Sequence, residues 1–107
     1  MPKTGDIVLV PFLFSDLSNH KVRPAVVVGY DAMTRHVTLC YITTQEKLSS
    51  FKVSVVSSRQ NGLNVDSFVV ASKIMTLEKK VFLGTIGKLE KRYMDEVKTK
   101  LKGLFNI

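Results

Sequence analysis

Strand-like runs separated by turn signals fill the first three quarters of this 107-residue chain, and they constrain its fold more than any other feature. The runs are short and rich in β-branched and aromatic residues, as strands covered on one face by a core are. A polar connection over residues 30–35, the pair Asn61-Gly62 and two later glycines separate them. The predicted strands are Ile7–Phe12, Ala25–Tyr30, His36–Ile42, Phe51–Val56 and Ser67–Lys73, with a shorter one near Phe82–Ile86.

Only one long helix is predicted, near Glu90–Lys102, and Gly103 is placed to end it. Apolar residues recur there at helical spacing and form one stripe that would pack on a sheet: Leu89, Tyr93, Met94, Val97, Leu101 and Leu104. Many short strands followed by one C-terminal helix predict a small, curled antiparallel β-barrel, mainly β (α+β). We expect a single domain over residues 1–107, with the function carried by loops at one end of the barrel.

Composition narrows the class of protein. No apolar run is long enough to span a bilayer and the N-terminus has no apolar signal segment, so we expect a cytoplasmic protein with no membrane partner. The single cysteine, Cys40, excludes an intrachain disulfide and a thiolate metal cluster. A net charge of +7 attracts polyanions, nucleic acid first, although a solvated cationic surface explains it equally well. Many of the cations fall on the expected outer face of the helix.

Arg23 is the most unusual charged residue in the chain. It precedes Pro24 at the foot of an apolar strand, and proline favours an extended backbone for the residue before it. A guanidinium cannot lose its proton and presents five donors in a fixed fork, which suits the recognition of phosphate. The alternative is a structural arginine that pairs with Asp6 or Asp16 and holds the neighbouring loop.

Five stretches, in this order and at this spacing, resemble the MazF/PemK (Kid) family of toxins from type II toxin–antitoxin systems. They cover nearly the whole chain: Gly5–Val8, Lys21–Val27, Tyr41–Gln45, Gly62–Ser67 followed by Lys73–Leu77, and Gly84–Leu89. The resemblance implies an SH3-like barrel that forms a homodimer. It also implies a metal-independent endoribonuclease without cofactors, which cuts single-stranded messenger RNA and is inhibited by a cognate antitoxin with an acidic, disordered tail.

The family's catalytic pair corresponds to Arg23 and Thr43. In such cleavage the 2′-hydroxyl attacks the adjacent phosphorus, which leaves a 2′,3′-cyclic phosphate and a 5′-hydroxyl. Thr43 has a plainer alternative, a strand-end threonine that satisfies a turn, and Thr44 beside it leaves the register open. The candidates for RNA binding are Ser18, Asn19, His20, Lys21, Gln45 and Lys73.

Two departures from the family pattern bear on activity. The loop before Arg23 reads Asp16–Lys21, where relatives are often Gly-rich, and Met75 stands where they often carry an arginine. They motivate an alternative function, a catalytically weak or inactive barrel that binds RNA or antitoxin. A third reading is a toxin that acts on a protein such as gyrase. His36 and Cys40 are expected to be structural, and no residue spacing indicates a metal site.

Overall fold

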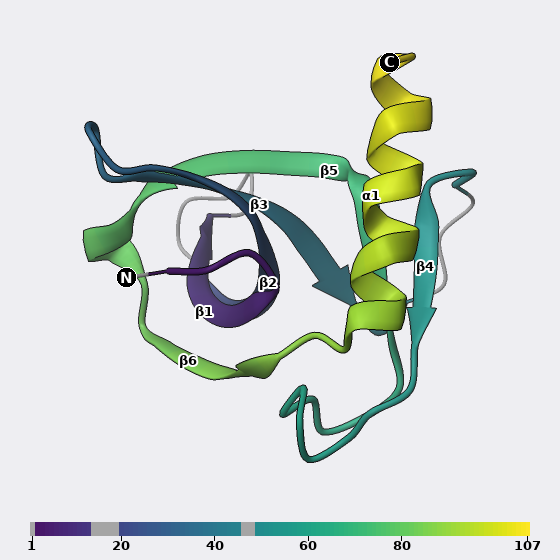
Figure 1. Cartoon of the computed structure of the whole chain (residues 1–107). Coiled ribbons are helices and arrows are strands. Elements are labelled where there is room, and N and C mark those ends of the chain that lie inside the picture. The colour runs from purple at the N-terminus through teal and green to yellow at the C-terminus, as the bar shows by residue number, and fades with distance from the viewer. Residues whose placement is uncertain (1, 14–19, 46–48) are drawn as a thin grey trace.

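In the part of the chain that this computed structural model describes, six strands form one curled antiparallel sheet and a single α-helix packs against it (Figure 1). The structure describes residues 2–13, 20–45 and 49–107, with the backbone alone for residues 12, 13 and 20. The elements are β1 (Asp6–Leu13), β2 (His20–Asp31), β3 (His36–Thr43), β4 (Lys52–Val55), β5 (Ser67–Glu78), a 3-10 turn η1 (Lys79–Val81), β6 (Gly84–Lys88) and α1 (Lys91–Phe105).

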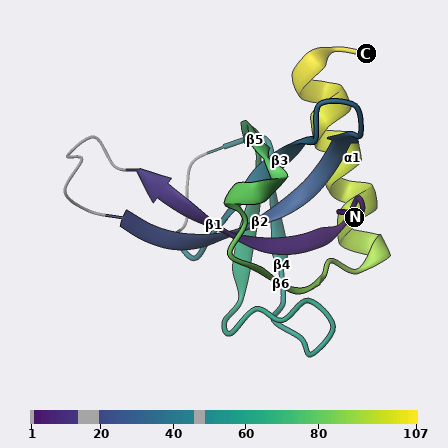
Figure 2. The ribbon, with the colours of Figure 1, turned by 90° about the vertical axis from the view of Figure 1, so that its left-hand side faces the viewer.

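The strands lie in the order β4-β5-β3-β2-β1-β6, and every neighbouring pair is antiparallel. Joining β6 to β1 brings the end of the strand region back to its start, which curls the sheet (Figure 1). The hairpin ends of β1 and β2 project away from α1 (Figure 2). The prediction of a small antiparallel barrel with a C-terminal helix is confirmed.

The sheet carries a separate apolar core on each face. The helix-side core lies between the sheet and α1 and contains Ile7, Val26, Cys40, Ile42, Val53, Val55, Leu63, Val69, Leu89, Tyr93, Met94 and Val97. The second core lies on the opposite face and contains Val8, Val10, Ala25, Val27, Val37 and Leu39. Successive side chains of a strand point to opposite faces of the sheet. A strand residue that follows or precedes a member of one core therefore faces the side of the other core.

Two strands are much longer than the sequence predicts. β2 begins at His20 because its pairing with β1 continues past Pro24, which lies opposite Leu9. β5 continues to Glu78 because an irregularity in its register with β3, between Cys40 and Tyr41, absorbs extra residues and lets pairing resume. The polar connection after β2 is a four-residue turn over residues 32–35.

The helix α1 buries Tyr93, Met94 and Val97 of the predicted stripe. Gly103 does not end it. The helix continues to Phe105, and Asn106 takes the left-handed conformation at φ 57° and donates its N–H to the Lys102 carbonyl, a geometry that asparagine tolerates well. Within the described part of the chain, no helix has the length and apolar character needed to cross a membrane.

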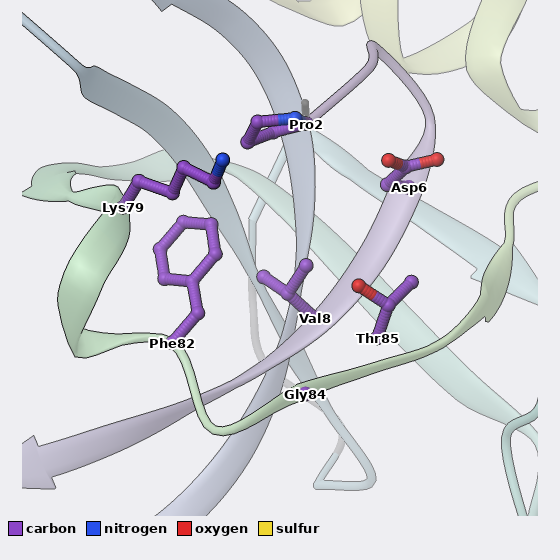
Figure 3. Close-up of a pocket in the computed structure, with 7 residues that line it drawn as sticks. All are labelled: Pro2, Asp6, Val8, Lys79, Phe82, Gly84 and Thr85. Atoms are coloured by element: carbon purple, nitrogen blue, oxygen red, sulfur yellow. The ribbon is translucent and has the colours of Figure 1, made fainter.

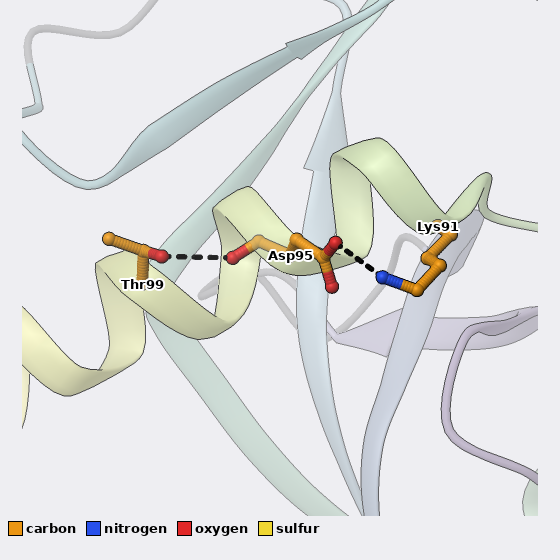
Figure 4. Close-up of polar contacts among 3 residues, drawn as sticks. All are labelled: Lys91, Asp95 and Thr99. Carbon is orange, nitrogen blue, oxygen red and sulfur yellow. Dashed lines mark hydrogen bonds and ion pairs between the residues drawn. The ribbon is translucent and has the colours of Figure 1, made fainter.

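The outer side of α1 is polar. Lys91 Nζ lies 2.8 Å from Asp95 Oδ2, and Thr99 Oγ1 donates to the Asp95 carbonyl at 3.0 Å (Figure 4). Both members of the ion pair are exposed, and such a pair on a helix stabilises by only about 0.3–0.5 kcal/mol. This side of the helix is therefore a solvated surface, as the sequence predicts.

A buried asparagine fixes the loop between β4 and β5. The Asn61 amide oxygen accepts from the N–H groups of Ser58 and Leu63, each at 3.0 Å. Its nitrogen donates to the Val56 carbonyl at 3.0 Å and to Glu90 Oε1 at 3.1 Å. All four hydrogen-bonding positions of the amide are used, so the loop is held against the start of α1.

Candidate active site

Arg23 lies on β2 where the strand leaves the buried core. It faces Val10 of β1, and its side chain is half-buried. The backbone is extended, as the following proline favours, and the next residues of the strand, Ala25, Val26 and Val27, are fully buried. The sequence thus places a permanent positive charge at the boundary of the apolar core.

Asp6 is not placed to pair with Arg23. It lies four residues along β1 from Val10, the residue that Arg23 faces, which is a separation of about 13 Å along an extended strand. Its carboxylate instead accepts a hydrogen bond from the Lys3 N–H at 2.9 Å. Asp16, the other alternative partner, lies outside the described residues.

Thr43 is the last residue of β3 and faces Phe68 of β5. Its hydroxyl oxygen accepts a hydrogen bond from the Gln45 N–H at 3.2 Å, so it does stabilise the turn after the strand. That bond uses an oxygen lone pair and leaves the hydroxyl proton as a donor. Thr44 comes after the strand end and is exposed.

The strand register brings Arg23 and Thr43 to the same end of two adjacent strands. Ala25 and Tyr41 are the last facing pair at this end of β2 and β3, so Arg23, two residues before Ala25, and Thr43, two residues after Tyr41, lie at the same end of the two strands, just beyond their paired region. Both follow the alternation of the second core, to which Ala25 and Leu39 belong. A guanidinium and a hydroxyl thus share one face, an arrangement suited to binding a phosphate.

The other predicted RNA-binding residues are distributed unevenly. Lys21 and Lys73 are exposed, and strand alternation assigns both to the same face as Arg23. Gln45 is exposed beyond the end of β3. Ser18 and Asn19 lie outside the described residues, and His20 begins β2 with only its backbone described.

Two residues on this face were missed by the sequence analysis. Val53 and Val69 point into the helix-side core, so Lys52 of β4 and Phe68 of β5 point to the opposite face. The Lys52 ammonium lies 5.0 Å from the centre of the Phe68 ring. The alternation of lysine and serine with valine over β4 was the available signal.

Met75 follows Lys73 on the second face of β5. It is half-buried and packs against the second core. The position where family members often carry an arginine is therefore apolar and supports the core in this chain.

The residues expected to be structural are placed accordingly. Cys40 is fully buried, its thiol lies 3.7 Å from the Ala71 carbonyl, and burial raises its pKa to about 11, which keeps it protonated. His36 begins β3 opposite Glu78. Among the described residues no three His, Cys, Asp or Glu side chains are grouped closely enough to hold a metal ion.

A pocket of about 280 Å³ opens elsewhere, between the N-terminal segment, β1 and the residues around η1 and β6 (Figure 3). Phe82 and Val8 form its apolar wall, with Asp6, Lys79 and Thr85 supplying polar groups. None of its lining residues belongs to the predicted site. The residues of the predicted site are thus separate from this pocket.

Comparison with known proteins relates this fold to one family. The model of the family described as "PemK-like, MazF-like toxin of type II toxin-antitoxin system" matches residues 3–105. No curated protein sequence matches the chain.

Solved structures share the fold at low sequence identity. A mycobacterial endoribonuclease in complex with its cognate antitoxin is 20% identical, with a TM-score of 0.78 over 100% of this chain and 97% of that chain. MazF from Deinococcus radiodurans is 22% identical, with a TM-score of 0.79 over 99% and 97%. MazE-MazF from the same organism is 23% identical, with a TM-score of 0.77 over 99% and 97%. The family match covers nearly the whole chain, and the chain therefore belongs to the PemK-like, MazF-like toxins of type II toxin–antitoxin systems.

Proposed function

We propose that this toxin is an endoribonuclease that cuts single-stranded RNA without a metal ion. The observation that carries the proposal is that Arg23 and Thr43 lie at the same end of the adjacent strands β2 and β3 and on the same face by strand alternation. Lys21 and Lys73 extend the positive charge of that face. Such lysines bind the phosphate groups of RNA whatever its base sequence.

RNA supplies the nucleophile for this reaction. The 2′-oxygen forms a bond to phosphorus, the bond to the 5′-oxygen breaks, and the products are a 2′,3′-cyclic phosphate and a 5′-hydroxyl. One proton leaves the 2′-hydroxyl and one joins the departing 5′-oxygen. The Arg23 guanidinium donates to the non-bridging oxygens as their charge grows, and the Thr43 hydroxyl donates to the same phosphate. Because a guanidinium is not deprotonated in proteins, arginine stabilises charge rather than acting as a base.

The proposal includes two partners. A cognate antitoxin with an acidic, disordered tail would compete with RNA for the cationic face, by charge complementarity. The family resemblance further indicates a homodimer. The mycobacterial and Deinococcus relatives were solved as complexes with antitoxin.

The test is cleavage of a long, unstructured RNA with EDTA present throughout. Wild type should give discrete products ending in 2′,3′-cyclic phosphate, and Arg23→Ala should cut about 10²–10³ times more slowly. Arg59→Ala, which removes an exposed arginine from the loop after β4, should cut at the wild-type rate. Equal cutting by wild type and Arg23→Ala, or intact RNA with every protein, contradicts the proposal.

Met75 favours one alternative function, a barrel that binds RNA or antitoxin without cutting. The side chain at this position packs on the second core and supplies no charge to the site. A gel shift with wild type, and no products under any condition, would support binding alone.

A further inference from the structure

Phe68 is a large aromatic side chain that neither core uses. It is half-buried on β5, whereas the next residue, Val69, is fully buried in the helix-side core. It is not part of the second core, although it lies on the same face. A half-exposed ring on a cationic strand face resembles the stacking platforms of proteins that bind single-stranded nucleic acids.

The position of Phe68 relates it directly to the phosphate site. It faces Thr43 across the β3–β5 ladder, and directly opposed side chains on one face have Cβ atoms about 4.5–5.5 Å apart. A phosphate bound by Thr43 and Arg23 would therefore have the base of an adjoining nucleotide within reach of the ring.

Lys52 gives this platform its charge. Its ammonium lies over the ring, 5.0 Å from the centre, close enough for a cation–π contact, and a base that stacks on that face would displace the ammonium toward the phosphate. The strand that carries Lys52 pairs with β5 on the side opposite β3, so the ring lies between Lys52 and Thr43. A nucleotide on the ring would have one phosphate near Thr43 and the next near Lys52.

We propose that Phe68 stacks on the base of a nucleotide next to the phosphate held by Arg23 and Thr43, and that Lys52 binds the following phosphate. The inference rests on the proposed function, because it takes the strand face to be the RNA site. The ring has no hydrogen-bonding group, so it selects a base by stacking area. Purines should be favoured over pyrimidines at this one position, with no preference between adenine and guanine.

The experiment measures stacking without cleavage. Short 2′-O-methyl oligoribonucleotides cannot supply the nucleophile, and 2-aminopurine, whose fluorescence falls when it stacks, is placed at successive positions. Their sequence is the one that wild type cuts, or a uridine tract if none is cut. Wild type should quench one position most strongly.

Phe68→Leu should lose that quenching and bind about 5- to 150-fold more weakly, the range for loss of one base–aromatic stack. Phe68→Trp should keep both the quenching and the wild-type affinity. Phe105→Leu, which removes an exposed aromatic residue from α1, should behave as wild type and is the matched control. Lys52→Gln should lower the salt dependence of binding, while Phe68→Leu should leave it unchanged. Thermal unfolding of each variant checks that it is folded.

The outcomes separate this inference from the proposed function. If Phe68→Leu binds and quenches as wild type does, the inference is wrong, even where wild type cuts RNA. If wild type binds and quenches through Phe68 but cuts no RNA, the inference stands and the cleavage proposal fails. If wild type binds none of the oligonucleotides, the inference is wrong, and the cleavage assay alone decides the proposed function.

Discussion

The carboxylate of Glu90 joins parts of the chain that are distant in sequence. One oxygen accepts from Ser58 Oγ at 2.6 Å and the other from the Asn61 amide at 3.1 Å. Glu90 also precedes the first turn of α1, but its side chain makes no capping bond to the helix backbone. The residue therefore fixes the β4–β5 loop to the helix start, and the ionised carboxylate is the stronger acceptor for both hydrogen bonds.

Stability should fall in acid through this residue. Partial burial acts to raise the Glu90 pKa, but hydrogen bonds from Ser58, the backbone and Asn61, with the charge of Arg92, outweigh it and lower the pKa from its ordinary 4.5. A lowered pKa in the folded state means that the stabilisation is complete above about pH 4.5 and is lost as the pH falls through the folded-state value.

Glu90→Gln provides the comparison, because its amide does not titrate. The difference in unfolding free energy between wild type and Glu90→Gln, measured in urea, should be larger near pH 7 than near pH 3. A difference that stays constant over this range would show that the Glu90 charge does not contribute to stability.

The helix α1 contains a glycine that its geometry does not require. Gly103 is exposed, its φ is not positive, and a Cβ there would lie 3.7 Å from Phe51 Cε1, an ordinary contact. Gly103→Ala should therefore raise the unfolding free energy by about 0.5–1 kcal/mol, because alanine loses less backbone entropy.

Gly87 of β6 is the matched contrast, since a Cβ there would overlap the Gln60 carbonyl oxygen and the Asn61 backbone. Gly87→Ala should lower the unfolding free energy. Denaturant unfolding measures the unfolding free energy of both variants. A Gly103→Ala variant less stable than wild type would contradict the prediction.

A secondary-structure element could be predicted from the sequence where its signal lies in neighbouring residues, and not where it depends on pairing with a distant strand. Alternation and turn residues are local, so every strand and the helix were found from the sequence. The extension of β5 to Glu78 depends on a register irregularity opposite Cys40 and Tyr41, which no local pattern shows. Gly103 predicted the helix end wrongly because Asn106, three residues later, adopts the left-handed conformation equally well.

The site was partly predictable for the same reason. Arg23 and Thr43 were proposed through the family resemblance, and the structure places them at the same end of the adjacent strands β2 and β3. Phe68 was missed because an aromatic residue in an apolar strand is read as core, and only the pairing of β4, β5 and β3 shows which face it occupies.

Across the whole molecule, the net charge of +7 is divided between two surfaces, the outer side of α1 and the face that carries Arg23. Only the lysines on the face that carries Arg23 should contribute to RNA binding. Replacing Lys73 with glutamine should reduce the slope of log binding constant against log salt by about 0.7, as expected when one contact to a single strand is lost. Lys98→Gln, an exposed lysine on α1, should leave the slope unchanged. Equal slopes for wild type and Lys73→Gln would exclude Lys73 from the RNA site.

The two outer strands of the sheet determine how this molecule can associate. β4, at one edge, has only four residues. At the other edge, the Lys88 N–H at the end of β6 donates to the Gln60 carbonyl at 2.9 Å, and Gln60 belongs to the loop that Asn61 holds in place. A short strand, and an edge whose end is covered by a loop, are poor templates for adding a foreign strand. A protein produced at high level should therefore resist fibril growth by strand addition, and its contacts with other molecules should form through side chains on its faces.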